Sequence, residues 1–197
     1  IDNTTINFVA GTRSGSVLSS ADGTNWTSRD TLQISSSIEV IYANSKFVVV
    51  GHGGIILTSS DGISWDNRTT STSDWLYGIT YGNSKFVTVG SSGKNYYSSD
   101  GNTWTAGTIN NTGTLYAITY GNSKFVAVGT TGTIITSSDG TSWDNSTSGT
   151  SVTLTDLTYG NSTFVAVGYE GTILTSADGT TWASKNSPVS HPQCDRR

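Results

Sequence analysis

Three acidic residues, Glu39, Asp156 and Glu170, could do chemistry because they lie outside the aspartate-containing turns that recur along the chain. A glycosidase needs two carboxyl groups several Å apart, one to protonate the leaving oxygen and one to act as base or nucleophile. The oxygens of Glu39 and Asp156 could instead hold a hard cation such as Ca²⁺. We favour a third interpretation, in which both are solvated residues of a central channel, and we expect no metal.

Histidine and cysteine are too scarce for the other common kinds of site. His52 and His191 are the only histidines, and Cys194 is the only cysteine. A zinc site takes about four nitrogen or sulfur ligands. A nucleophilic triad needs a serine or cysteine motif that accompanies a histidine, and the sequence has none. We therefore expect a protein that is not an enzyme and that carries no cofactor.

The charge composition excludes two classes of partner. Only 12% of the 197 residues are charged, and the formal net charge is −4 with a pI near 4.9. Such a chain offers no basic surface to neutralise phosphates, so we expect no nucleic acid partner. No apolar run approaches the roughly 18 residues that a membrane-spanning helix needs, so we expect no membrane insertion.

Polar composition and possible glycan acceptors suggest where the protein works. The chain is rich in Ser, Thr, Asn and Gly, which suits an extracellular surface, and we expect it to be secreted or displayed on the cell surface. It opens at Ile1 without a basic or apolar leader, which indicates a processed or excised chain. Six Asn-x-Ser/Thr sequons could accept a glycan in a host that glycosylates. They begin at Asn3, Asn25, Asn67, Asn110, Asn145 and Asn161.

The positions of these residues depend on a repeat that covers almost the whole chain. The best copy is LYAITYGNSKFVAVGTTGTIITSSDGTSW, residues 115–143, and its Phe and Trp recur every 39 residues, as from 86 to 125. A fixed period of about 20 to 50 residues indicates a stack or ring of equal units, none of which can bury its apolar face alone. The recurring residues are Phe8, Phe47, Phe86, Phe125 and Phe164, with Trp26, Trp65, Trp104, Trp143 and Trp182.

Each unit reads as four short strands, which predicts an all-β, five-bladed β-propeller. The runs LYAIT, FVAVG and TIITS, and a fourth that opens on Trp, are rich in β-branched and aromatic residues. A β-trefoil has three lobes rather than five, and a parallel β-helix needs shorter coils. We expect one domain over residues 1–187, with units at about 1–36, 37–75, 76–114, 115–153 and 154–187, and a non-repeat tail at 188–197. Its four-stranded blades would be antiparallel, and the first blade would be incomplete.

The turn Ser-Ser/Ala-Asp-Gly joins the third and fourth runs of every unit. Aspartate can accept hydrogen bonds from backbone N–H groups two residues on, and glycine supplies a positive φ, which is the chemistry of a tight hairpin. A catalytic interpretation would have to explain why each unit has one such residue, so we expect a structural role. The aspartates are Asp22, Asp61, Asp100, Asp139 and Asp178.

These turns also carry a family resemblance. The segments SADGTNW, SSDGISW, SSDGNTW, SSDGTSW and SADGTTW resemble a one-residue-shorter Asp box, the turn between the third and fourth strands of each blade in sialidase-like propellers. The flanking repeat, over about residues 7–183, is similar to bacterial secreted propellers and to the photosystem II assembly-factor type. The resemblance implies a propeller fold. It does not carry sialidase activity, which would need a cluster of arginines that the chain's five arginines do not match.

Differences among the copies give the functional prediction. The YGNSK and SSDG turns barely vary, whereas the loops between the second and third strands and the linkers between units do. In a propeller these two loop sets lie on one face, where fixed strands can present different side chains to a partner. We expect a non-enzymatic extracellular binding module for a glycan or a protein. The candidate binding residues are Arg13, His52, Trp75, Lys94, Tyr169 and Glu170.

Two other functions stay open. The chain could be a structural or assembly subunit of a larger appendage or complex, with its odd tail as a docking segment that carries Cys194. A glycoside hydrolase-like enzyme is the third choice, because no constellation of acid, base and nucleophile stands out. The way in which the ring closes bears on assembly. We expect Ile1–Ile6 to supply the missing innermost strand of the first blade, with the tail outside the sheet.

Overall fold

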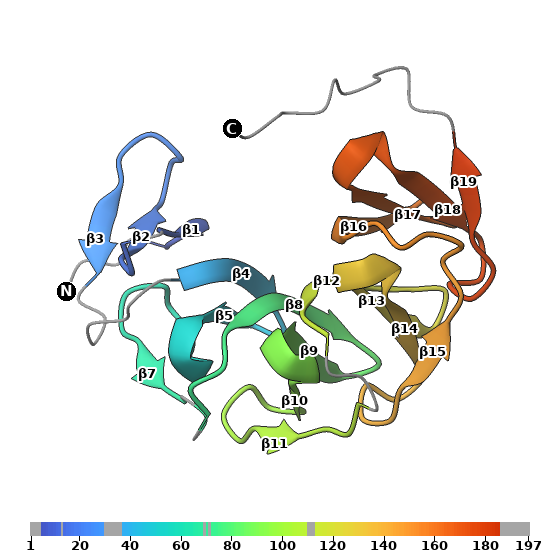
Figure 1. Ribbon diagram of the computed structural model, residues 1–197. Coiled ribbons are helices and arrows are strands. Elements are labelled where there is room, and N and C mark those ends of the chain that lie inside the picture. The colour runs from blue at the N-terminus through green and yellow to red at the C-terminus, as the bar shows by residue number, and fades with distance from the viewer. Residues whose placement is uncertain are drawn as a thin grey trace, which may run out of the picture.

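Every repeat unit folds into its own small antiparallel sheet, and the five sheets follow one another along an arc in the computed structural model (Figure 1). The structure describes residues 5–12, 14–29, 37–68, 70, 72–109 and 113–185. Within each sheet the strands pair in chain order, as in a propeller blade, and the predicted five-bladed β-propeller fold is confirmed.

Within the ranges that the structure describes, the first blade has three strands and the other four blades have four each. Short 3₁₀ turns, η1 to η4, join the second and third strands of the later blades. The elements in chain order are β1 (Phe8–Gly11), β2 (Val17–Ser20), β3 (Thr27–Arg29), β4 (Ser37–Ala43), β5 (Lys46–Gly51), η1 (His52–Gly54), β6 (Ile56–Ser59), β7 (Asp66–Asn67), β8 (Leu76–Gly82), β9 (Lys85–Gly90), η2 (Ser91–Gly93), β10 (Asn95–Ser98), β11 (Thr105–Ala106), β12 (Leu115–Gly121), β13 (Lys124–Gly129), η3 (Thr130–Gly132), β14 (Ile134–Ser137), β15 (Asp144–Ser146), β16 (Leu154–Gly160), β17 (Thr163–Gly168), η4 (Tyr169–Gly171), β18 (Ile173–Ser176) and β19 (Ala183–Lys185).

The hairpin between the first and second strands of a full blade depends on two residues with positive φ. In the fourth blade these are Asn122, with φ 44°, and Ser123, with φ 58°. Positive φ at both central residues defines the turn whose twist matches a β-hairpin. Asn tolerates this region better than most residues, which explains the recurring Gly-Asn-Ser sequence.

The Asp-Gly turn is held by the aspartate side chain, as the sequence predicted. In the third blade, Asp100 Oδ1 accepts the N–H groups of Asn102 at 2.8 Å and Thr103 at 2.9 Å, and it also accepts the Ser98 hydroxyl at 3.0 Å. Gly101 takes φ 74°. These bonds, above all the one from the Thr103 N–H, favour the ionised carboxyl and lower the pKa of Asp100 to about 2. The pKa values of the other four turn aspartates are lowered as well.

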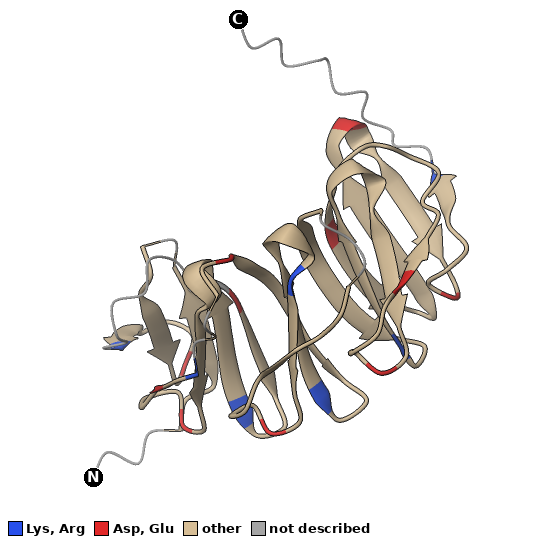
Figure 2. Ribbon diagram, turned by 60° about the horizontal axis from the view of Figure 1, so that its bottom comes forward, with Lys and Arg blue, Asp and Glu red and all other residues tan. Residues whose placement is uncertain are grey.

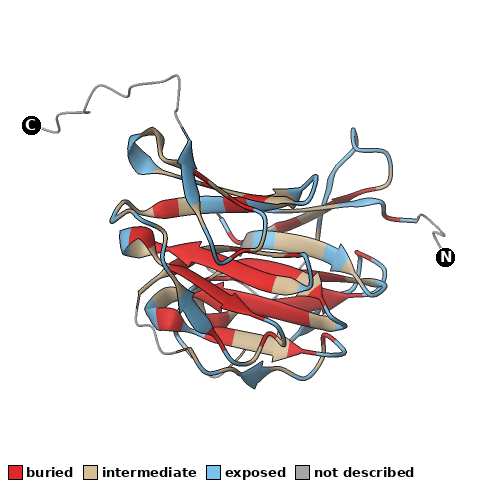
Figure 3. Ribbon diagram, turned by 90° about the vertical axis from the view of Figure 1, so that its right-hand side faces the viewer, coloured by how far each residue is buried: buried red, intermediate tan, exposed pale blue. Residues whose placement is uncertain are grey.

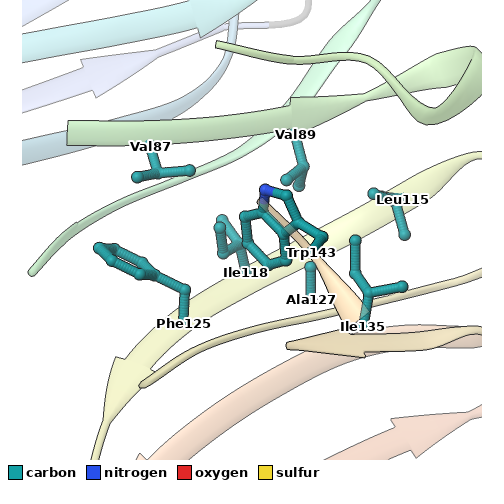
Figure 4. Packing of buried hydrophobic residues seen from close by; sticks show 8 residues of the cluster. All are labelled: Val87, Val89, Leu115, Ile118, Phe125, Ala127, Ile135 and Trp143. Carbon is teal, nitrogen blue, oxygen red and sulfur yellow. The ribbon is translucent and has the colours of Figure 1, made fainter. Parts of the chain in front are cut away.

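The hydrophobic core lies between blades rather than within them. Trp143 of the fourth blade packs against Val87 and Val89 of the third, together with Phe125 and Ile135 of its own sheet (Figure 4). We expected the tryptophan to start the outer strand, but Trp143 stands just before β15. From there its ring packs against the preceding blade. Both faces of a middle blade are therefore covered (Figure 3). This explains the run of buried residues along β13.

The arc stays open between the first and fifth blades among the described residues. Contacts between inner strands run from blade to blade in sequence, and the sheets of β1–β3 and β16–β19 stand on opposite sides of a gap (Figure 1). Side chains that are buried in the middle blades are exposed at these ends. Phe8 is 48% exposed whereas Phe125 is fully buried, and Val167 is 38% exposed whereas Val128 is fully buried.

The expected closing strand is not found in the part of Ile1–Ile6 that the structure describes. Thr5 and Ile6 form no strand but lead directly into β1. The Asn7 N–H donates to the Ser20 carbonyl and so continues the pairing of β1 with β2. Ile6 is buried against Gly62 of the second blade instead. Residues 1–4 and the tail with His191 and Cys194 lie outside the described residues. Among the described residues the first blade has no innermost strand, in agreement with the prediction of an incomplete first blade.

Replacement of the wedge residue Trp143 by alanine should destabilise the fold by about 3 to 5 kcal/mol, the usual cost of emptying a large aromatic site in a core. Trp26→Ala is the matched control: Trp26 occupies the same position in the first blade but is 43% exposed, against 8% for Trp143. We expect the control to cost less than about 1 kcal/mol. Denaturant unfolding of both variants measures the difference, and equal losses would contradict packing between blades.

The turn aspartates should make stability depend on acidity. The folded pKa of Asp100 is about 2, and the unfolded value is about 3.9. Its contribution is therefore full above about pH 4 and is lost as the pH falls toward the folded pKa. Asp100→Asn should lower the free energy of unfolding at pH 7, and the gap from wild type should shrink steadily below pH 4. Denaturant unfolding at several pH values checks this, and a gap that does not change with pH would refute it.

Candidate binding site on the variable-loop face

The loops between the second and third strands lie beside the linkers that enter each blade, as expected. The Ser91 N–H donates to the Trp75 carbonyl at 2.8 Å, the Thr130 N–H to Thr114 at 2.9 Å, and the Tyr169 N–H to Thr153 at 3.1 Å. In each 3₁₀ turn, the central residue takes a positive φ: Gly53, Ser92, Thr131 and Glu170. The same backbone frame thus presents different side chains in each blade.

Aromatic side chains gather where the second and third blades meet. The His52 ring in η1 stacks on Trp75 with the ring centroids 3.7 Å apart and the planes 9° from parallel. Tyr77 of β8 meets Trp75 edge-on at 6.0 Å, and Tyr116 of β12 meets Tyr77 at 5.3 Å. We call His52, Trp75, Tyr77 and Tyr116 the aromatic cluster. Trp75 is 46% exposed, so the cluster offers a broad apolar ring to solvent.

Backbone and hydroxyl contacts fix the exposed tryptophan. The Trp75 N–H donates to Ser91 Oγ at 2.9 Å, and the linker before it is braced by the Thr72 hydroxyl, which donates to Asp74 Oδ2 at 2.5 Å. Loss of solvation around the imidazole lowers the pKa of His52, which favours the neutral ring at pH 7. The cluster is thus a preformed, uncharged platform with the carboxylate of Asp74 on the adjoining residue.

The other predicted binding residues do not join this cluster. Tyr169 and Glu170 are exposed in η4 of the fifth blade, next to the open side of the arc. Lys94 is exposed after η2, where its N–H donates to the Ser91 carbonyl. Arg13 lies outside the described residues. Of the six candidates, the structure brings only His52 and Trp75 into contact.

Glu39, which we expected to be a solvated channel residue, is exposed and also has a structural partner. Its Oε2 accepts the Ile79 N–H at 2.7 Å, so it links the inner strands of the second and third blades. Loss of solvation by neighbouring atoms raises the pKa of Glu39. The hydrogen bond from Ile79 lowers this pKa, and the negative charge of Asp156 raises it further. Glu39 is exposed, which limits the size of the shift. Asp156 Oδ1 accepts the Leu157 N–H at 2.8 Å.

No group of three or more His, Cys, Asp or Glu side chains converges on a metal-sized site within the described ranges. None of the helices there is long and apolar enough to cross a membrane.

Lys and Arg are few and are interspersed with Asp and Glu rather than gathered on one face (Figure 2). The sequons at Asn25, Asn67, Asn145 and Asn161 are exposed, whereas Asn3 and Asn110 lie outside the described residues.

Sequence reasoning missed Tyr77 and Tyr116, because each reads as an ordinary strand residue in LYGIT and LYAIT. The available signal was their position: the other units have Ile38 and Thr155 there. Asn95 stands where the other units have Ile or Val, and it is buried. With its amide turned to satisfy both groups, it donates to the Gly107 carbonyl at 3.3 Å and accepts from Trp143 Nε1 at 3.2 Å.

Neither a protein-family model nor a curated protein matches the sequence. Solved structures match it in fold. YCF48 bound to a D1 peptide is 19% identical, with a TM-score of 0.64 over 78% of this chain and 54% of that one. The computationally designed protein Ika8 is 14% identical, with a TM-score of 0.70 over 90% and 59%. A chain of the nidogen/laminin complex is 12% identical, with a TM-score of 0.65 over 85% and 70%.

At these identities the likeness shows the fold alone, and it supports the β-propeller architecture. The chain spans about half the length of the YCF48 chain that it matches. The expected resemblance to the photosystem II assembly-factor type holds at the level of the fold. The Asp box and the bacterial secreted class stay predictions.

Proposed function

We propose that the protein is a non-enzymatic binding module whose ligand rests on the aromatic cluster. The observation that carries this proposal is the stacked His52–Trp75 pair, which leaves Trp75 46% exposed on the face where the repeat units differ. Large exposed aromatic rings held rigidly are typical of binding hot spots, because little side-chain entropy is lost when a ligand covers them.

A peptide or protein is the ligand class that we favour. The structure of YCF48 holds a D1 peptide, and the nidogen chain is in complex with laminin, so two propellers of similar fold have protein partners. The cluster runs from a linker onto two inner strands, which suits an extended chain. A glycan is the second class, because a sugar face can stack on Trp75 while Asp74 accepts its hydroxyls. We place this activity outside the cell, on the compositional grounds given above.

The positions of the acidic groups support a function without catalysis. Glu39 and Asp156 both accept backbone N–H groups, so these carboxylates serve the fold. The turn aspartates do so in every blade. Glu170 stands exposed in η4. A glycoside hydrolase would need two free carboxylates aimed at one bond.

Trp75→Ala should reduce binding at least tenfold and leave the fold intact. A phage-displayed peptide library and a printed glycan array serve as the probes, and ligands selected on the wild-type chain are measured again with the variant. Tyr169→Ala is the matched control, because Tyr169 is a still more exposed aromatic on the same loop set and is not in the cluster. Ligands that bind the Trp75→Ala chain at full strength would place the site elsewhere and contradict the proposal.

A structural or assembly role is the second candidate, and the open arc favours it. Phe8 and Trp26 on the first blade and Val167 on the fifth expose the apolar surfaces that neighbouring blades cover elsewhere. Surfaces that are normally buried between repeats need a cap or a partner. The assembly could join copies of this chain or bring in other proteins.

If copies of this chain use these surfaces, sedimentation velocity should show concentration-dependent association that Val167→Arg abolishes. Ser184→Arg is the matched control, because Ser184 is exposed on β19 and pairs with Leu174, on the sheet face turned toward the fourth blade. A wild-type chain that stays monomeric at all concentrations would exclude self-assembly through the open faces.

A further inference from the structure

Among the described residues, the first blade has an empty place at its inner edge. In the other four blades, a seven-residue inner strand pairs antiparallel with the second strand, as β12 does with β13. By the period of the repeat, β1 corresponds to the second strand, since Phe8 aligns with Phe47. Within the described ranges β1 pairs only with β2. Its inner edge therefore offers backbone N–H and C=O groups, which template the addition of a strand.

A tyrosine on the neighbouring blade marks the same empty place. In the later blades this tyrosine covers the glycine that ends the preceding inner strand: a Cβ on Gly82 would lie 2.0 Å from Tyr120 Cγ, and one on Gly121 would lie 2.2 Å from Tyr159 Cγ. Tyr42 is the equivalent residue of the second blade, and it is 60% exposed. The residue that it would cover is missing from the described part of the first blade.

Tyr42 is already held in the covering orientation. Its ring stands 4.6 Å from Phe47 at 49°, and Tyr120 stands 4.7 Å from Phe125 at 54°. The ring therefore need not move to receive a strand. A preformed contact of this kind lowers the entropic cost of binding.

We propose that the inner edge of β1 binds an extended segment of another polypeptide, which adds antiparallel to β1 as the missing inner strand. Main-chain hydrogen bonds to the edge would supply affinity, and the side-chain pockets would supply specificity. The segment carries the sequence shared by the inner strands β8 and β12, Leu-Tyr-x-Ile-Thr-Tyr-Gly. Its last residue is small, because it lies beneath Tyr42. Ala43, which ends β4 and packs in the same core cluster as Tyr81, shows that alanine is the upper limit found in the chain.

This site gives the assembly role a partner of defined chemistry, and it rests on that second candidate rather than on ligand binding at the aromatic cluster. It also differs from association through the apolar faces, because it needs the β1 edge and Tyr42 and does not need Val167. Trp75→Ala and Val167→Arg should therefore leave it unchanged. Failure of this inference would leave both earlier proposals standing.

The test uses the full chain and a fluorescein-labelled peptide with the sequence of residues 114–123, TLYAITYGNS. Fluorescence anisotropy should show saturable binding at one peptide per chain. A Gly121→Val peptide should bind at least tenfold more weakly, and a scrambled peptide should not bind. Amide hydrogen exchange should slow at Phe8–Gly11 when the peptide is added, with little change in β13.

Variants of the chain locate the site. Tyr42→Ala should weaken peptide binding several-fold, whereas Trp26→Ala, a similarly exposed aromatic outside the inner edge, should not. Three results would overturn the proposal: no saturable binding, equal binding by the Gly121→Val peptide, or β1 amides that are already protected in the free chain. The last result would mean that another segment of the same chain occupies the edge.

Discussion

The fold depends on the fact that no blade can bury both of its faces alone. The second strand of a middle blade, such as β13, is apolar on both sides, and Phe125, Val126, Ala127 and Val128 are all fully buried. A single four-stranded sheet would leave at least one of these faces in water. Trp143 closes the interface with the preceding blade, and Trp65, Trp104 and Trp182 pack in the same way in their blades. Stability therefore comes from contacts between nearest neighbours, as in other repeat proteins.

The local structure could be predicted from sequence because its causes are local. The Asn-Ser hairpins and the Asp-Gly turns need particular residues at positive φ, and the sequence repeats the first pair four times and the second pair five times. The open arc could not be predicted, since a period of 39 residues gives the number of blades but not the angle between them. That angle depends on the packing between neighbouring sheets, where Trp143 meets the preceding blade.

The candidate site was predictable only in part, for the same reason. The sequence indicated that His52 and Trp75 lie on one face, because loop and linker positions are fixed by topology. It could not show that the two rings stack, or that Tyr77 and Tyr116 extend the cluster, since those contacts depend on the spacing between blades. The partner of Glu39 could not be predicted, because it is a backbone N–H, which leaves no trace in the sequence. The two faces differ in what their side chains do. On one face, polar side chains form the hydrogen bonds of the repeated turns; on the other, side chains such as that of Trp75 are exposed to solvent.

Identical interfaces in series also govern how the molecule comes apart. The third blade is covered on both sides by complete neighbours, whereas the first and fifth are each held from one side. Such an array behaves like a one-dimensional chain of coupled units, in which opening starts at an end and moves inward. Under mechanical load the terminal blades would detach one at a time, each step exposing a fresh surface of the same kind. The folded array would then shorten by one blade at a time, and its central blade would be the last to unfold.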